Sequence, residues 1–380
     1  MKLNKKYLFN IVLILALTFV AMYFDLKDDY KLAMQALERM NTFNMILVLS
    51  WGLLFTMVWG ISYQILGAKY KKNYSLLEGI NVAFIGNFFA GITPSSTGGQ
   101  IGQIYVLKKQ GISYSDGASL LWADFIIYQT TMMIYVTILF ALRFTHYVNL
   151  SAWFWIVFAG YLMNVVVIVI LYTIAIFPVF YLRLIDKLLN VVSRFKFFKK
   201  REAALVKTKD TITRFTKEIK HLSQDRVLIV KCMLVNIVRL SLHFSLPYFV
   251  ARGIGIDVHL NQFVDVMALS SFVTMANSFI PLPGASGGTE VVFSLLFRGM
   301  FGALTGAVLL LWRISSYYIP MIAGALIFIV FKNRQDHQPD SEDHQDSDQE
   351  DPVELLVEDQ AVIKEEIPIV SSIKKAEQPA

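Results

Sequence analysis

Residues 91–103 read GITPSSTGGQIGQ, and this run of small and polar residues interrupts an apolar segment. A second apolar segment is interrupted in the same way at residues 280–290, which read IPLPGASGGTE. Each copy has a proline and, after three intervening residues, a pair of glycines: Pro94, Gly98 and Gly99 in the first copy, and Pro283, Gly287 and Gly288 in the second. Two matching interruptions of this kind predict a duplicated unit with a broken helix in each half.

The likeness between the two halves continues beyond the breaks at a constant spacing. The two prolines are 189 residues apart, and the same offset joins three further pairs without a gap: Gly117 and Gly306, Asp124 and Arg313, and Tyr128 and Tyr317. Discontinuous helices in a repeat are found in membrane transporters, where the substrate site lies near the midplane of the bilayer. The sequence therefore predicts a transporter-like site between its two breaks.

The composition is that of an integral membrane protein. Of the 380 residues, 55% are hydrophobic and 17% are charged, whereas a soluble domain carries about 25% charged residues. The mean hydropathy is +0.52. Cys232 is the one cysteine of the sequence, which excludes a disulfide within the chain and a metal centre built on cysteines. The sequence has no P-loop, dinucleotide fingerprint or Ser-His-Asp set, so we expect no catalytic residues, no metal and no cofactor.

Apolar runs predict six membrane-spanning helices, at residues 7–24, 45–66, 117–142, 152–182, 227–251 and 303–331. The two broken segments, residues 76–107 and 263–298, are predicted to be re-entrant, so that each enters the bilayer and returns to the same side. The predicted fold is thus an all-α integral membrane protein, a polytopic helical bundle with two broken, re-entrant helices in an inverted repeat.

Charge divides the chain into a basic membrane domain and an acidic tail. Residues 1–331 hold 30 basic and 15 acidic residues, which favours anionic lipid head groups as partners rather than nucleic acid. Residues 332–380 hold 14 acidic against 5 basic residues and no aromatic residue, so they are predicted to be disordered. The insert at residues 183–226 holds 13 basic against 5 acidic residues.

The positive-inside rule distinguishes two topologies. If each broken segment crossed the bilayer completely, the basic insert would lie on the opposite side from the amino terminus. If both are re-entrant, the amino terminus, the insert and the acidic tail all lie in the cytoplasm. The sequence therefore favours a multi-pass protein of the cell membrane with re-entrant segments.

The breaks are the candidate substrate site. Backbone groups that Pro and Gly leave unpaired persist at membrane depth only when buried in protein or lining a wet cavity. Hydroxyl residues before a helix can cap its amino terminus, where N–H groups and the helix dipole favour a phosphate. The candidate substrate-binding residues are Pro94, Ser95, Ser96, Thr97, Gly98, Gly99 and Gln100 in the first break, and Pro283, Gly287, Gly288 and Glu290 in the second. The alternative interpretation is two structural kinks.

Charged side chains within the apolar runs are further candidates, because each costs about 2.5–3.5 kcal/mol at the middle of a membrane helix. Asp124 and Arg313 either pair with each other or bind opposite ends of a head group, with Arg313 on a phosphate and Asp124 on an ammonium. Glu290 is another candidate partner for the ammonium. Arg239 and His243 lie four residues apart, on one face of a helix, and could line the same cavity.

These motifs resemble the signatures of the lysylphosphatidylglycerol synthase transmembrane family, the flippase-like membrane half of the multiple peptide resistance factor. The first signature is carried by residues 93–100, TPSSTGGQ, and residues 105–111, YVLKKQG. The second and looser one is carried by residues 281–290 and by Arg313 with Tyr317, which adds Tyr317 to the candidate substrate-binding residues. The likeness covers the whole predicted membrane domain.

The resemblance implies a membrane lipid translocase. Such a protein would move aminoacylated phosphatidylglycerol, or a related anionic phospholipid, between leaflets and so contribute to resistance to cationic antimicrobial peptides. The alternative is a membrane component of phosphatidylglycerol lysyltransferase, with the transferase activity in another chain. Bifunctional family members carry a soluble aminoacyltransferase domain, whereas 49 residues follow Phe331 here, so a lysyltransferase label is expected to be inherited from the family. A homo-oligomer, a separate aminoacyltransferase partner and a non-transporting scaffold stay open.

The predicted topology can be tested with single cysteines in place of Tyr70, Lys109 and Lys200. All three positions lie in basic segments, so a membrane-impermeant thiol reagent should label them only from the cytoplasmic side. Labelling of position 109 from the outside would contradict the re-entrant arrangement of the first break.

Overall fold

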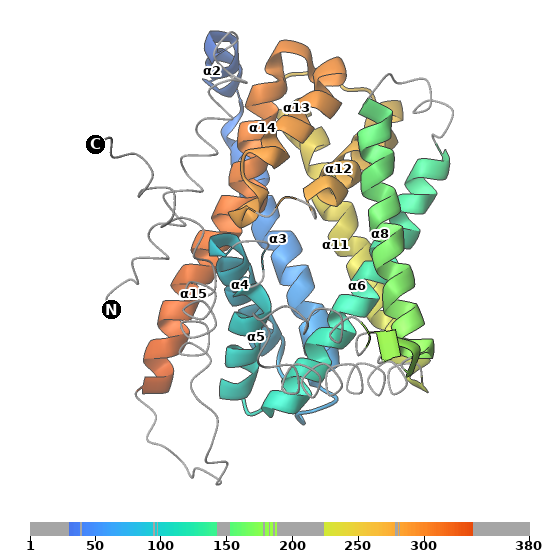
Figure 1. Cartoon of the computed structure of the whole chain (residues 1–380). Coiled ribbons are helices and arrows are strands. Elements are labelled where there is room, and N and C mark those ends of the chain that lie inside the picture. The colour runs from blue at the N-terminus through green and yellow to red at the C-terminus, as the bar shows by residue number, and fades with distance from the viewer. Residues whose placement is uncertain are drawn as a thin grey trace, which may run out of the picture. The chain divides into compact units, whose positions relative to one another are not determined.

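The computed structural model of the chain (Figure 1) describes residues 30–38, 40–93, 96, 98–142, 153–177, 179–181, 183, 184, 187, 224–277, 280 and 282–336. The predicted span at residues 7–24, most of the basic insert and the tail beyond residue 336 lie outside these residues. The chain divides into two compact units, Met1–Val330 and Phe331–Ala380. The site and its supports all belong to the first unit.

Every regular element of the described residues is a helix. The long helices are α3 (Thr42–Gly67), α6 (Tyr114–Leu142), α8 (Trp153–Ile176) and α11 (Arg226–Gly253). The shorter ones are α2 (Tyr30–Glu38), α4 (Leu76–Ile92), α5 (Gly98–Lys109), η2 (Leu260–Gln262), α12 (Phe263–Asn277), η3 (Pro283–Ala285) and α13 (Gly288–Phe301). The remaining elements follow one another directly: η4 (Gly302–Leu304), α14 (Thr305–Arg313), the π-helix η5 (Ile314–Tyr318) and α15 (Ile319–Asp336).

Length and hydropathy make this a multi-pass membrane protein, as predicted. Among the described residues, four helical runs are long and apolar enough to cross a bilayer, namely Thr42–Gly67, Tyr114–Leu142, Arg226–Gly253 and Gly288–Arg334. Large apolar side chains are exposed along their outer faces and along α8, for example Met163, Val166 and Ile170. In a bilayer such faces contact lipid tails.

The predicted repeat is present in the order and position of the helices. The helices α3, α4, α5 and α6 correspond in turn to α11, α12, α13 and the run from α14 to α15. At the 189-residue offset of the two prolines, each counterpart begins within five residues of the expected position. Figure 1 shows α4 and α5 in the lower half of the bundle and α12 and α13 in the upper half. The two helix–break–helix units therefore approach the middle from opposite ends.

The base of the α4–α5 hairpin is closed by polar side chains. The Lys71 ammonium, ahead of α4, lies 2.6 Å from the Glu78 carboxylate and donates to the Gln110 carbonyl, just after α5, at 2.7 Å. The Tyr74 hydroxyl donates to the Gln110 side chain. Burial raises the pKa of the Tyr74 hydroxyl above its usual range, so this group keeps its proton at neutral pH and stays a donor. The two ends of the hairpin are thereby held together.

The predicted span at residues 303–331 lies within one continuous helical run, which changes its winding in the middle. A π-helical turn, η5, separates α14 from α15, and the Ile319 N–H donates to the Ile314 carbonyl five residues earlier. Pro320 follows at once and has no N–H to continue the α-helical ladder. Such turns are frequent at functional sites, and this one directly follows Arg313.

The helix α3 packs against this π-helical turn at backbone distance. The Ser315 hydroxyl donates to the Val48 carbonyl and accepts from the Gly52 N–H at 3.3 Å, so it lies between two groups that pair with each other in a regular helix. A methyl group built on Gly52 would lie 1.7 Å from the Ser315 carbonyl oxygen. Only glycine fits at this crossing.

Gly52→Ala should therefore destabilise the protein by about 1–3 kcal/mol or more, the usual effect of overpacking a tight contact. Gly299→Ala on α13 is the matched control, because nothing lies within 4 Å of the added methyl group. Thermal unfolding in detergent measures both. Equal melting temperatures for the two variants would contradict this close contact.

Candidate functional site

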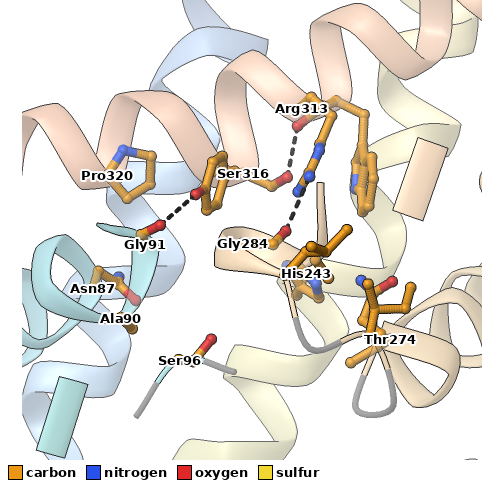
Figure 2. Close-up of a pocket in the computed structure, with 16 residues that line it drawn as sticks. Asn87, Ala90, Gly91, Ser96, His243, Thr274, Gly284, Arg313, Ser316 and Pro320 are labelled. Atoms are coloured by element: carbon orange, nitrogen blue, oxygen red, sulfur yellow. Dashed lines mark hydrogen bonds between the residues drawn. The ribbon is translucent and has the colours of Figure 1, made fainter. Parts of the chain in front are cut away.

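A cavity of about 420 Å³ lies where the two breaks meet (Figure 2). The first half contributes Asn87, Ala90, Gly91 and Ser96, and α11 and α12 contribute His243, Thr274 and Asn277. The second break contributes Ile280, Leu282, Gly284 and Ala285, and the α14–α15 run contributes Trp312, Arg313, Ser316, Tyr317 and Pro320. The cavity is thus lined by residues from both members of the repeat.

Arg313 fixes the shape of the second break. Its Nε donates to Glu290 Oε1 at 2.7 Å, and one terminal nitrogen donates to the Gly284 carbonyl at 3.0 Å and lies 3.4 Å from the Ser286 hydroxyl. The guanidinium carbon lies 4.7 Å from the centre of the Tyr317 ring. Arg313 is 4% exposed and Glu290 is 1% exposed, so the two form a buried ion pair in which each charge compensates the other.

Glu290 also stabilises the amino terminus of α13. Its second oxygen, Oε2, accepts the Gly287 N–H at 2.7 Å, one of the N–H groups that a helix start leaves unpaired. A methyl group on Gly288 would lie 2.4 Å from the Ile280 side chain, so this glycine is needed for packing. Neither glycine lines the cavity in the structure.

The proposed pairing of Asp124 with Arg313 is wrong. The guanidinium of Arg313 is held by Glu290 on its own half of the repeat, while Asp124 Oδ2 accepts from the indole N–H of Trp59 at 3.0 Å. Asp124 is buried but does not line the cavity. An offset in sequence brings two residues to equivalent places in the two halves, and equivalent places need not touch.

Thr93 caps the start of α5 after the first break. Its Oγ1 accepts the Gly98 N–H at 2.8 Å, a contact that was not among the predictions. Ser96 is exposed, lines the cavity and has a φ of 57°. Pro94, Ser95 and Thr97 lie outside the described residues.

The glycine pair of the first break packs against α4. A methyl group on Gly98 would lie 2.5 Å from the Thr93 side chain, and one on Gly99 would lie 3.0 Å from Ala90. Gln100 is exposed and, like both glycines, is absent from the cavity lining. The two glycines therefore allow close packing beside α4, and none of the three positions lines the cavity.

Tyr317 connects the two breaks. Its hydroxyl donates to the Gly91 carbonyl at the end of α4 at 2.9 Å (Figure 2). Gly284, with a φ of 58°, approaches the same ring so closely that a methyl group there would lie 2.1 Å from the Tyr317 hydroxyl. One side chain thus contacts both halves of the repeat and the guanidinium of Arg313.

The chemistry of the cavity suits an anion. Beside Arg313, its lining residues have two buried ring nitrogens, His243 Nδ1 and Trp312 Nε1, that lack a hydrogen-bond partner in the described part of the chain. The indole Nε1 can only donate. No Asp or Glu is among the described residues that line the cavity. The sequence did indicate His243, whereas Trp312 resembled an ordinary apolar residue of the span.

Comparison with known proteins gives a family match over most of the chain. The model of the lysylphosphatidylglycerol synthase TM region matches residues 8–324. A UPF0104 membrane protein of Archaeoglobus fulgidus is 24% identical over 301 residues, which are 78% of this chain and 89% of the relative. An uncharacterized protein of Mycoplasma pneumoniae, an MG306 homolog, is 23% identical over 334 residues, 81% of this chain and 82% of the relative.

No solved structure gives a significant match to the chain. The family match spans both breaks, the cavity and the buried ion pair. The chain belongs to the lysylphosphatidylglycerol synthase TM family.

Removing one partner of the buried pair should be costly. Arg313→Leu leaves Glu290 charged and buried, and such a loss typically costs about 3–5 kcal/mol. Glu290→Gln keeps an acceptor for Gly287 but leaves the guanidinium without its counter-charge. The double variant has no charge left, so its destabilisation should be smaller than the sum of the two single effects.

Thermal unfolding in detergent compares the three proteins with wild type. Arg298→Leu, which removes an exposed arginine from α13, is the control and should unfold within a few degrees of wild type. Strictly additive losses in the double variant would show that the pair contributes no coupling.

Proposed function

We propose that this member of the family moves a phospholipid, either aminoacylated phosphatidylglycerol or a related anionic lipid, between the two leaflets of the cell membrane. The observation that carries the proposal is the cavity between the two breaks, whose described lining residues include the guanidinium of Arg313, the indole of Trp312 and the imidazole of His243 but no carboxylate. A phosphodiester is the group of a phospholipid that accepts hydrogen bonds and carries negative charge.

The position of the cavity supports a lipid as substrate. It lies between helix breaks that approach from opposite ends of the bundle (Figure 1). In an inverted repeat of this kind, transport proceeds by rocking one half against the other around a fixed central site. We infer that the α4–α5 and α12–α13 units are re-entrant from opposite faces, with the amino terminus, the basic insert and the acidic tail in the cytoplasm.

The cavity favours recognition of the phosphate over recognition of an aminoacyl ammonium. Glu290, the carboxylate nearest to the second break, has both oxygens occupied by Arg313 and the Gly287 N–H. Asp124 is away from the cavity lining. An aminoacyl group would thus be carried along with the phosphate that the site binds. Moving such a cationic lipid to the outer leaflet would lower the negative surface charge that attracts cationic antimicrobial peptides.

A leaflet-resolved assay in reconstituted vesicles tests the proposal. The purified protein is placed in vesicles with labelled phosphatidylglycerol or lysylphosphatidylglycerol, and loss of label from the outer leaflet is followed with an impermeant quencher. Faster movement than in protein-free vesicles is expected for both lipids. Formation of new aminoacyl lipid from charged tRNA, without movement, would instead support the lysyltransferase alternative.

A bulky residue in the cavity should stop this movement. Ser316→Phe places a ring in the space beside Arg313 and Tyr317 (Figure 2), and lipid movement should fall to the rate of protein-free vesicles. The matched control is Ile322→Phe on α15, a position that is exposed on the outer face of the helix and absent from the cavity lining. It should move lipid at the wild-type rate. Wild-type movement in a well-folded Ser316→Phe protein would remove the cavity from the transport path.

A further inference from the structure

A second buried polar cluster lies outside the cavity, where α3, α6 and α11 pack together. At its centre is Asp124 of α6, which is 6% exposed. Its Oδ2 accepts from the Trp59 indole N–H at 3.0 Å, and the Tyr63 side chain faces this carboxylate. The other oxygen, Oδ1, is buried and has no hydrogen-bond partner among the described residues. A carboxylate oxygen left unpaired in this way is costly and calls for a ligand.

A positively charged side chain, Arg239, is held near the carboxylate by two aromatic rings. The Arg239 guanidinium of α11 lies 4.1 Å from the centre of the Trp59 ring and 4.7 Å from that of Tyr128. Among the described residues, neither Asp124 nor Arg239 has an ion-pair partner within 4.0 Å. The guanidinium thus offsets the charge of Asp124 without occupying its free oxygen.

The ligand that this oxygen fits is a proton. The Arg239 guanidinium, held near the carboxylate, disfavours a metal cation there. The ammonium of a lipid head group cannot reach the site from the cavity, because none of the cluster's residues lines that cavity. A proton needs only one lone pair, and Oδ1 offers it.

We propose that Asp124 takes up and releases a proton during the transport cycle, so that lipid movement is coupled to a proton gradient. The exchange is a simple one: the carboxylate accepts a proton from a hydronium ion on one side of the membrane and returns it to water on the other. This coupling rests on the proposed lipid movement, whereas the proton site itself does not.

The groups around the carboxylate explain how a proton would matter to an anionic substrate. The titratable groups that face it are Tyr63 on α3, Tyr128 on α6, and Arg239 and Cys232 on α11. Of these, only the guanidinium carries a permanent charge. Protonation of Asp124 therefore changes the charge of the cluster from zero to +1. Arg239 lies one turn of α11 before His243, which lines the cavity, so the added positive charge makes the cavity more favourable for a phosphate.

A hydrogen bond joins the cluster to the first hairpin. The Tyr63 hydroxyl, on the side chain that faces Asp124, accepts from Gln103 Nε2 at 2.8 Å. Gln103 is 4% exposed and lies on α5, the half-helix that follows the first break. Its amide packs directly on α4, since a methyl group on Gly86 would lie 2.3 Å from Nε2. A change in the charge of Asp124 is thereby transmitted to both helices of the first hairpin.

The proton site can be tested without any transport. Trp59 donates to the carboxylate, so its fluorescence emission in detergent should change with pH along a single titration curve. Asp124→Asn should abolish this change and Asp124→Glu should shift its midpoint, while Trp59→Phe should remove the signal. Asp116→Asn, which alters an exposed aspartate at the start of the same helix, should leave the curve unchanged. The proposal would be overturned if the wild-type emission did not change between about pH 4 and pH 9, roughly the range in which a buried carboxyl group titrates.

The coupling is tested in vesicles that contain labelled phosphatidylglycerol and carry a pH gradient. Wild-type protein should move the lipid faster in one gradient direction than in the other, whereas Asp124→Asn should move it at a rate that does not depend on the gradient. A gradient response that survives in Asp124→Asn would overturn the coupling. Wild-type vesicles that move no lipid at all would overturn the proposed function instead, and the fluorescence titration would then decide the proton site alone.

Discussion

The buried guanidinium of Arg313 is the constraint around which the second break is built. A charged side chain that is 4% exposed inside a membrane bundle needs a counter-charge and hydrogen-bond acceptors. The second break supplies both, and a regular helix would not, because its backbone carbonyls are already paired. Glu290 gives the counter-charge from the first turn of α13, and the Gly284 carbonyl is free to accept because the backbone turns there at a φ of 58°. The break, the cap of α13 and the position of Tyr317 all follow from satisfying this one side chain.

The two halves share a plan but treat their charged residues differently. At equivalent places the first half has Asp124 and the second has Arg313. The second half contains its own counter-charge, Glu290, at the start of the following half-helix. At the corresponding place the first half has Ile101, an apolar residue, so its carboxylate depends on Trp59 and on the distant charge of Arg239. The duplicated fold therefore contains one buried ion pair, Arg313 with Glu290, and one carboxylate, Asp124, that has no ion-pair partner among the described residues.

The sequence predicted the helices and breaks of the described residues well, because length, hydropathy and the spacing of Pro and Gly are local properties. Side-chain partners were predicted poorly, because they depend on how helices far apart in sequence cross. A pairing of Asp124 with Arg313 was one of two alternatives drawn from the repeat, and the bond from the Gly98 N–H to Thr93, which lies one residue before the proline, was not predicted. Apart from Pro320, the sequence contains no feature that predicts the π-helical turn after Arg313. It likewise contains no feature that distinguishes Trp312, which lines the cavity, from an aromatic residue that faces lipid.

The contact of Ser315 with α3 has a mechanical consequence. The Ser315 hydroxyl is inserted between the Val48 carbonyl and the Gly52 N–H and bonds to both, so it links η5 to the backbone of the neighbouring helix. For α3 to slide or rotate against η5, both hydrogen bonds of the Ser315 hydroxyl would have to break, and the two backbones are already in close contact at Gly52. The two elements must therefore travel as one rigid body, and relative motion in the protein has to be sought at helix faces that are not pinned in this way.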